Sequence, residues 1–142
     1  MPGQTYKFLI TKLNLIGGKH TLKDFSNASA EWVESIEGNY RNIKIHEAPP
    51  NSQGLVALII LAILERFNFN KISKTDYTHV FCEAAKIGYF LRDQYLADPN
   101  YNKLSVDHFL NSKIITQYAS NIDMNKANTY DKSDFPNHPD TI

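Results

Sequence analysis

The chain has 142 residues, and 15 Lys and Arg balance 15 Asp and Glu, so its formal net charge at pH 7 is zero. The length fits one domain of common size, with enough chain to bury a core. The balanced charge argues against nucleic acid and anionic membranes as partners. The lone cysteine, Cys82, excludes an internal disulfide and a CxxC site, and its apolar helical surroundings predict a small core residue.

The first part of the chain predicts a helix followed by a capped turn. The helix is expected over residues 6–16 and ends at Gly17-Gly18, with apolar residues at helical spacing: Phe8, Leu9, Leu13 and Ile16. Thr21 is expected to cap a single helical turn that has Asp24 in its first turn. The N-terminus has no long apolar core or small-residue cleavage site, so no secretory signal is predicted.

A β-hairpin is predicted next, with strands at residues 32–36 and 40–46. Ile43 and Ile45 alternate with polar residues, which is the period-two pattern of a strand. The turn is expected at residues 37–39, which read Glu-Gly-Asn. The two prolines at 49 and 50 are expected to end the second strand, because proline has no N–H to donate to strand pairing.

The next predicted element is a helix that is apolar on almost every face. Asn51 or Ser52 is expected to cap it, and it is expected to run to about Phe67. A helix of this kind is buried on all sides. A chain this short covers such a helix poorly, so part of the covering surface is expected to come from chain outside this sequence. The apolar run at residues 55–64 is about half as long as a bilayer span.

A second long helix is expected over residues 76–96, with Thr75 as its cap. Its inner face is predicted to consist of Val80, Phe81, Ala84, Ala85, Ile87, Gly88 and Leu91. Short helices are expected near residues 105–110 and 113–122.

The chain becomes polar from Asn125 onward, with few apolar residues to bury. This composition predicts an extended or disordered tail. The expected division is therefore residues 1–124 as one mainly helical α+β domain with one hairpin, and residues 125–142 as the tail.

Few residues form a pattern with recognisable chemistry. His79 and Glu83 share a helix face, but two ligands without a third favour a surface pair or a helix-start histidine over a metal site. No metal and no cofactor are expected. Structural ion pairs are predicted for Glu83 with Lys86 and for Arg92 with Asp93 or Asp98. The loop at residues 49–54 precedes a helix N-terminus, which attracts anions. A structural loop is the preferred interpretation, with Gly54 permitting close packing.

Several blocks of the chain together resemble γ-glutamyltransferase (γ-glutamyltranspeptidase) proenzymes, over nearly the whole sequence. The blocks are Gly17-Gly18 followed by Thr21-Leu22-Lys23-Asp24-Phe25, Pro49-Pro50-Asn51-Ser52-Gln53-Gly54 followed by Leu61 to Phe67, Tyr95-Leu96-Ala97-Asp98-Pro99, and the end Asn137-His138-Pro139-Asp140-Thr141-Ile142. Their order and spacing are specific to the family.

The resemblance implies a fragment of an N-terminal-nucleophile hydrolase, an αββα sandwich whose precursor cleaves itself before a Thr. That position matches Thr141, with Asp140 as the residue before the cut. The freed hydroxyl would attack a γ-glutamyl amide, typically glutathione, and pass the acyl group to water or an amino acid. An Asp-Thr junction is closer to the acylase-like branch of the family. The substrate-binding residues stay unassigned.

Important parts of the family pattern are missing from this sequence, both at its start and after the nucleophile. We therefore expect a fragment that is inactive alone, whose partners are separately made flanking pieces of the same enzyme. The alternative is a stand-alone helical interaction module that kept the scaffold and lost catalysis. The chain as written is expected to be soluble and cytoplasmic, whereas an intact enzyme could also be periplasmic or secreted.

Overall fold

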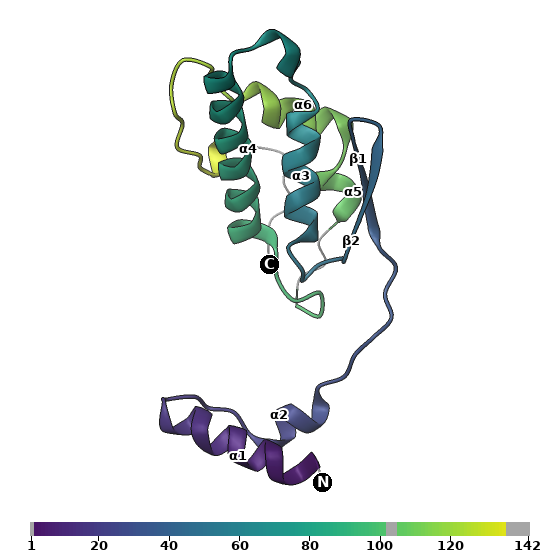
Figure 1. Ribbon diagram of the computed structural model, residues 1–142, viewed down its shortest axis with the longest axis vertical. Helices are drawn as coiled ribbons and strands as arrows, with labels where there is room; N and C mark the ends of the chain where they lie inside the picture. Colours follow the sequence, from purple (N-terminus) through teal and green to yellow (C-terminus); the bar gives the residue numbers. More distant parts are fainter. Residues whose placement is uncertain (1, 102–104, 136–142) are drawn as a thin grey trace. The chain divides into compact units, whose positions relative to one another are not determined.

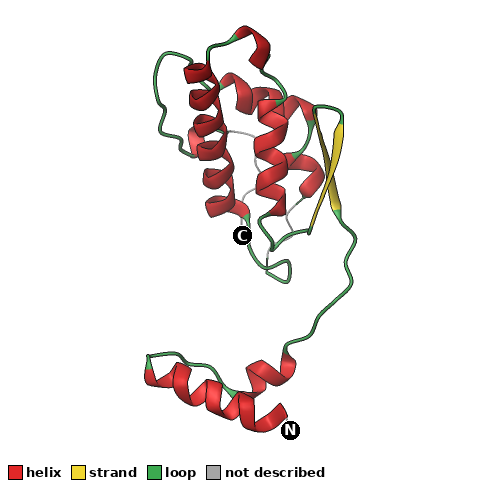
Figure 2. Ribbon diagram, in the orientation of Figure 1, coloured by secondary structure: helices red, strands yellow, loops and turns green. Residues whose placement is uncertain are grey.

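The computed structural model describes residues 2–101 and 105–135. The chain divides into two compact units, Met1–Trp32 and Val33–Ile142. Helices dominate both units, and one two-stranded antiparallel sheet lies in the second (Figures 1 and 2). The predicted fold class, α+β and mostly helical with one hairpin, is confirmed.

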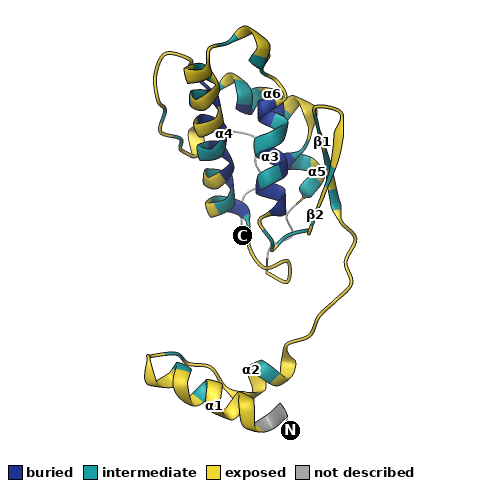
Figure 3. Cartoon of the chain, viewed as in Figure 1, coloured by how far each residue is buried: buried dark blue, intermediate teal, exposed yellow. Residues whose placement is uncertain are grey.

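The first unit consists of helices α1 (Pro2–Leu15) and α2 (Leu22–Asn27). Gly17 follows α1 with a φ of 90°, a left-handed conformation that suits glycine at a helix end. Thr21 caps α2 as predicted: its hydroxyl accepts from the backbone N–H of Asp24, whose carboxylate accepts from the Thr21 N–H at 2.7 Å. No residue between 4 and 32 is buried, as Figure 3 shows.

The hairpin consists of β1 (Ile36–Tyr40) and β2 (Ile43–Glu47), with Gly38 opposite Ile45. The predicted strand at residues 32–36 and turn at 37–39 are wrong. The turn is made by Arg41 and Asn42, whose φ angles of 51° and 65° are those of a two-residue hairpin turn. Gly38 lies inside β1, where a larger residue would not fit, because a Cβ there would lie 2.9 Å from the Leu58 side chain.

Tertiary contacts hold Arg41 in this turn. Its backbone N–H donates to the Glu65 carboxylate at 3.1 Å, and its guanidinium donates to the Phe67 carbonyl at 3.0 Å. The guanidinium also lies over the rings of Tyr40 and Phe69. Contacts with Glu65 and Phe67, which are distant in sequence, therefore favour the turn at residues 41–42 over the predicted turn at residues 37–39.

Helix α3 (Gly54–Leu64) contacts α4, the hairpin and α6 (Figure 1). Its N-cap is Gln53, which makes no side-chain bond, and not Asn51 or Ser52 as predicted. The helix ends at Leu64, before the predicted Phe67. Ser52 instead accepts from the Gly54 N–H and donates to the Ala48 carbonyl. A Cβ at Gly54 would lie 2.6 Å from the Cβ of Glu47, so the predicted close packing at this glycine is confirmed.

Helix α4 (Lys74–Tyr95) packs along α3. Its cap is Ser73, in a capping box with Asp76, and not Thr75 as predicted. The expected inner face is mostly correct: Val80, Ala84, Ile87, Gly88 and Leu91 are buried. Phe81 and Cys82 are exposed, which corrects both predictions, because they follow Val80 onto the outer face of the helix.

Helices α5 (Val106–Phe109) and α6 (Ser112–Ser120) close the core, and short 3-10 turns occur at Phe69–Lys71 and Lys132–Asp134. The main core cluster, dark in Figure 3, consists of Leu55, Ile59, Ile63, Leu64, Val80, Ala84, Ile87, Leu91, Tyr95, Phe109, Ile115, Tyr118, Ile122 and Phe135. No helix among the described residues is both long enough and apolar enough to cross a membrane.

Residues 125–135 pack against the helices of the unit more closely than the expected tail. They are irregular apart from the short turn, but Phe135 is only 3% exposed. Its ring centroid lies 5.2 Å from that of Phe90, 5.4 Å from that of Tyr118 and 6.0 Å from that of Tyr130. The sequence misled here because the partners of Phe135 come mainly from helices earlier in the chain.

Candidate functional site

The predicted nucleophile Thr141 and the residue before the cut, Asp140, both lie outside the described residues. What the structure does describe is the chain that leads toward them. We call residues 121–135 the approach segment. It starts at the end of α6 and its last residue is Phe135 in the core.

Glu83 binds the approach segment from α4. It is the buried charged side chain among the described residues, at 2% exposure. Its Oε1 accepts a hydrogen bond from Lys86 Nζ at 2.6 Å. Its Oε2 accepts from the Tyr130 hydroxyl at 2.8 Å and from the Asn128 backbone N–H at 3.3 Å. The predicted Glu83–Lys86 pair is therefore confirmed, and two further donors complete it.

The electrostatics of this network favour a charged carboxylate. Burial acts to raise the pKa of Glu83, but the hydrogen bonds from Lys86, Tyr130 and Asn128 outweigh it and hold that pKa below its ordinary value. Burial and the bond to Glu83 raise the pKa of the Tyr130 phenol. At neutral pH the carboxylate is therefore ionised, the phenol keeps its proton, and Lys86 compensates the buried charge.

Three further hydrogen bonds tie down the approach segment. His79 on α4 lies with its Nε2 2.9 Å from the Asp123 carbonyl oxygen, which can only accept, so Nε2 is the donor. Within the segment, Asn121 donates to the Asp134 carbonyl at 3.0 Å, and Asn128 donates back to the Asn121 carbonyl at 2.8 Å. His79 and Glu83 thus both face the approach segment. No cluster of three metal-ligating side chains occurs in the part of the chain that the structure describes.

The sequence predicted the Glu83–Lys86 ion pair, but its interpretation of His79 and Glu83 as a surface pair is wrong, because Glu83 is buried. Tyr130 and Asn128 were missed. One feature of the sequence could have indicated that this segment is partly buried: Tyr130 and Phe135 are aromatic residues in a stretch that is otherwise mostly polar. An amphipathic ring in such a stretch commonly buries its face and keeps a hydrogen bond at its hydroxyl.

The network predicts a pH-dependent contribution to stability. Because the pKa of Glu83 is lowered by folding, its stabilisation is fully present above its ordinary pKa near 4.5 and is lost as the pH falls through the folded-state value. Glu83→Gln should therefore lower the free energy of unfolding by about 1–3 kcal/mol at pH 7. Denaturant titrations from pH 7 to pH 3 should show the gap to the wild type closing in acid. A gap that stays constant or widens would contradict this assignment.

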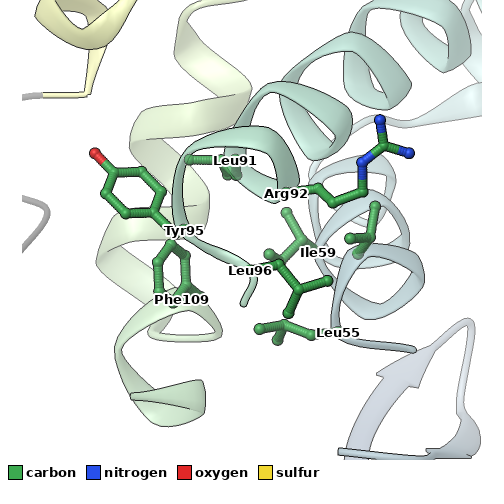
Figure 4. A pocket seen from close by; sticks show the side chains of 8 residues that line it. Leu55, Ile59, Leu91, Arg92, Tyr95, Leu96 and Phe109 are labelled. Atoms are coloured by element: carbon green, nitrogen blue, oxygen red, sulfur yellow. The ribbon is translucent and has the colours of Figure 1, made fainter. Parts of the chain in front are cut away.

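Two hollows of the second unit differ in size. Figure 4 shows an apolar pocket between α3, α4 and α5, with a volume of about 10 Å³. The Arg92 guanidinium extends away from it, and pairs with Asp93 at 2.8 Å as predicted. A larger hollow of about 250 Å³ lies beside the hairpin, lined by Glu37, Gly38, Asn39, Ile45, Leu58, Leu61, Ala62 and Leu110. Ligand sites generally measure about 300–1,000 Å³, so the apolar pocket is far too small for a substrate, whereas the hollow beside the hairpin approaches the lower end of that range.

The loop before α3 has structural contacts at each end. Ser52 bonds to Ala48 and Gly54, and the Gln53 amide oxygen accepts from Arg92 at 3.4 Å. These contacts support the structural interpretation of residues 49–54, in which the loop sets the start of α3 against the end of β2.

Comparison with known proteins relates this architecture to one family. A family model described as Gamma-glutamyltranspeptidase matches residues 2–141. The Glutathione hydrolase-like YwrD proenzyme of Bacillus subtilis (strain 168) is 32% identical over 122 residues, which is 84% of this chain and 23% of that protein. The chain spans between a fifth and a quarter of the length of the curated relatives it matches.

Solved structures of the same kind resemble the fold. Gamma-glutamyltranspeptidase from Pseudomonas nitroreducens, complexed with L-DON, has a TM-score of 0.73 and 25% identity, covering 88% of this chain and 39% of that one. Cephalosporin acylase from Bacillus halodurans has a TM-score of 0.72 and 31% identity, covering 85% of this chain and 23% of that one. The resemblance drawn from the sequence motifs is thereby confirmed, and the fold is that of part of these N-terminal-nucleophile hydrolases.

Proposed function

We propose, on the premise that this chain belongs to the gamma-glutamyltranspeptidase family, that it forms part of a proenzyme that cleaves itself between Asp140 and Thr141. The mature enzyme would transfer a γ-glutamyl group, with glutathione as the typical donor, to water or an amino acid. The observation that supports this proposal is that the family match extends to residue 141, through the predicted junction.

Thr141 would carry the chemistry as a new N-terminal residue. Its hydroxyl attacks the carbonyl carbon of the γ-glutamyl amide while its own α-amine accepts the proton. The C–N bond then breaks, the amine leaves with a proton, and the acyl group stays as an ester on Thr141. Water or an acceptor amine attacks this ester and regenerates the hydroxyl.

The described residues contribute scaffold in this proposal. We assign residues 1–124 to part of the large-subunit region and residues 125–142 to the chain that leads to the cut. The apolar pocket of about 10 Å³ holds no γ-glutamyl group. The substrate pocket and the donors that stabilise the developing oxyanion would come from further chain, in one polypeptide or as separate pieces.

The proposal predicts that the purified 142-residue chain releases no amine from a γ-glutamyl anilide. The matched test uses a chimera in which this chain replaces the region of the B. subtilis YwrD proenzyme that it matches. The chimera should cleave itself and release the amine, because positioned partners supply most of the acceleration. Gamma-glutamyltranspeptidase from P. nitroreducens is the positive control. Amine release by the isolated chain would contradict its proposed inactivity.

A second candidate function is a stand-alone helical interaction module. One observation favours it: the unit Val33–Ile142 builds a buried core from its own helices. A monomer with one cooperative melting transition supports the module. A collapsed state that binds a hydrophobic dye supports a fragment that needs further chain.

A further inference from the structure

Glu83 has no part in the chemistry proposed above, yet it carries a charge in the core. Removing a carboxylate from water is costly unless every lone pair finds a partner. Here Lys86 lies one turn farther along the same helix, whereas Tyr130 and Asn128 belong to the approach segment. The side chain therefore links two parts of the chain that are more than forty positions apart in sequence.

The arrangement of donors requires a carboxylate. One oxygen of Glu83 faces Lys86 and the other faces both Tyr130 and Asn128, so three donors converge on two acceptor atoms. A glutamine has one acceptor oxygen and one NH₂ group. In either orientation its NH₂ would face a donor, and at least one of the three bonds would be lost.

The other contacts of the approach segment act in the same direction. His79 lies four residues before Glu83 on the same helix, and its side chain binds the Asp123 carbonyl. The Lys86 ammonium lies 5.7 Å from the centroid of the Tyr130 ring. Phe135 then fixes the far end of the segment against Phe90. The approach segment is thus held along α4 at three successive points, the last of them its final described residue.

We propose that Glu83 is a positioning residue that holds the approach segment against α4. It thereby fixes the end of that segment, from which the chain continues to the junction at Asp140 and Thr141. The consequence for self-cleavage rests on the proposed function. A peptide bond is cleaved efficiently only when the reacting groups are held near the attack geometry, and small displacements from a remote change slow such reactions strongly.

The first test is amide hydrogen exchange on the full 142-residue chain. Glu83→Gln should raise exchange in residues 126–135 about tenfold or more beyond the rise in α3, whose amides report the loss of global stability. Tyr130→Phe removes a single hydroxyl and should give a smaller increase in the same residues. The matched control is Glu65→Gln, which removes a carboxylate charge beside Arg41 and does not touch the approach segment. Unchanged exchange at 126–135, or a rise there no larger than the rise in α3, would overturn the proposal.

The second test measures the rate of self-cleavage in the chimera. Glu83→Gln should slow cleavage about tenfold or more with the product still cut at the same bond, and Glu65→Gln should leave the rate within about twofold of the wild type. Equal rates for Glu83→Gln and wild type would overturn the positioning role. A wild-type chimera that folds and stays uncut contradicts the proposed function instead, and the exchange data then decide whether Glu83 holds the segment.

Discussion

Thr141→Ala in the chimera should abolish self-cleavage and reduce amine release by at least about 1,000-fold, because alanine has no nucleophilic oxygen. Thr141→Ser keeps the hydroxyl and should retain measurable cleavage. Both variants are assayed by gel mobility of the precursor and by amine release from a γ-glutamyl anilide.

Thr129→Ala is the matched control for that experiment. Thr129 is an exposed threonine of the approach segment, so its loss removes the same atoms from a site with no proposed chemistry. It should cleave and turn over like the wild type. A Thr141→Ala protein that is still cut before residue 141 would show that another group supplies the nucleophile.

Ile63→Ala should cause the largest loss of stability, about 2–5 kcal/mol in the free energy of unfolding. Ile63 is 0% exposed on α3, inside the main core cluster. Its truncation removes buried methyl groups and leaves a cavity that rigid neighbours fill only in part. Denaturant unfolding followed by circular dichroism measures the effect.

Ile43→Ala provides the comparison at the surface. Ile43 lies on the hairpin with its side chain 64% exposed. The same truncation there should lower the free energy of unfolding by less than about 0.5 kcal/mol. Similar losses for Ile43→Ala and Ile63→Ala would mean that α3 is not the centre of the core.

Local pattern was sufficient where an element is decided by its own residues. The Thr21 capping box and the apolar run of α3 were readable because both depend on side chains close in sequence. The position of the hairpin turn could not be predicted from local pattern. Arg41 and Asn42 take left-handed angles because Glu65 and Phe67 bind Arg41 from a distant part of the chain. Cys82 shows the related limit, since one step around a helix separates a core position from an exposed one.

The candidate site divides in the same way. Glu83 and Lys86 were predicted as a pair because they lie one helical turn apart. The bonds from Tyr130 and Asn128 join positions more than forty residues apart. The sequence marks Tyr130 as an aromatic residue in a polar stretch, but it does not identify Glu83 as its partner. The proposed role of Thr141 came from the family motif alone, because a threonine in a polar stretch has no local feature that marks a nucleophile.

The central claim is that this chain carries the self-cleavage junction of a gamma-glutamyltranspeptidase proenzyme. The most direct measurement is the N-terminal sequence of the smaller product formed by the purified wild-type chimera. The claim predicts a product that begins Thr141-Ile142, made without added protease. A folded chimera that stays uncut while the YwrD proenzyme processes under the same conditions, or a product that begins elsewhere, would contradict it.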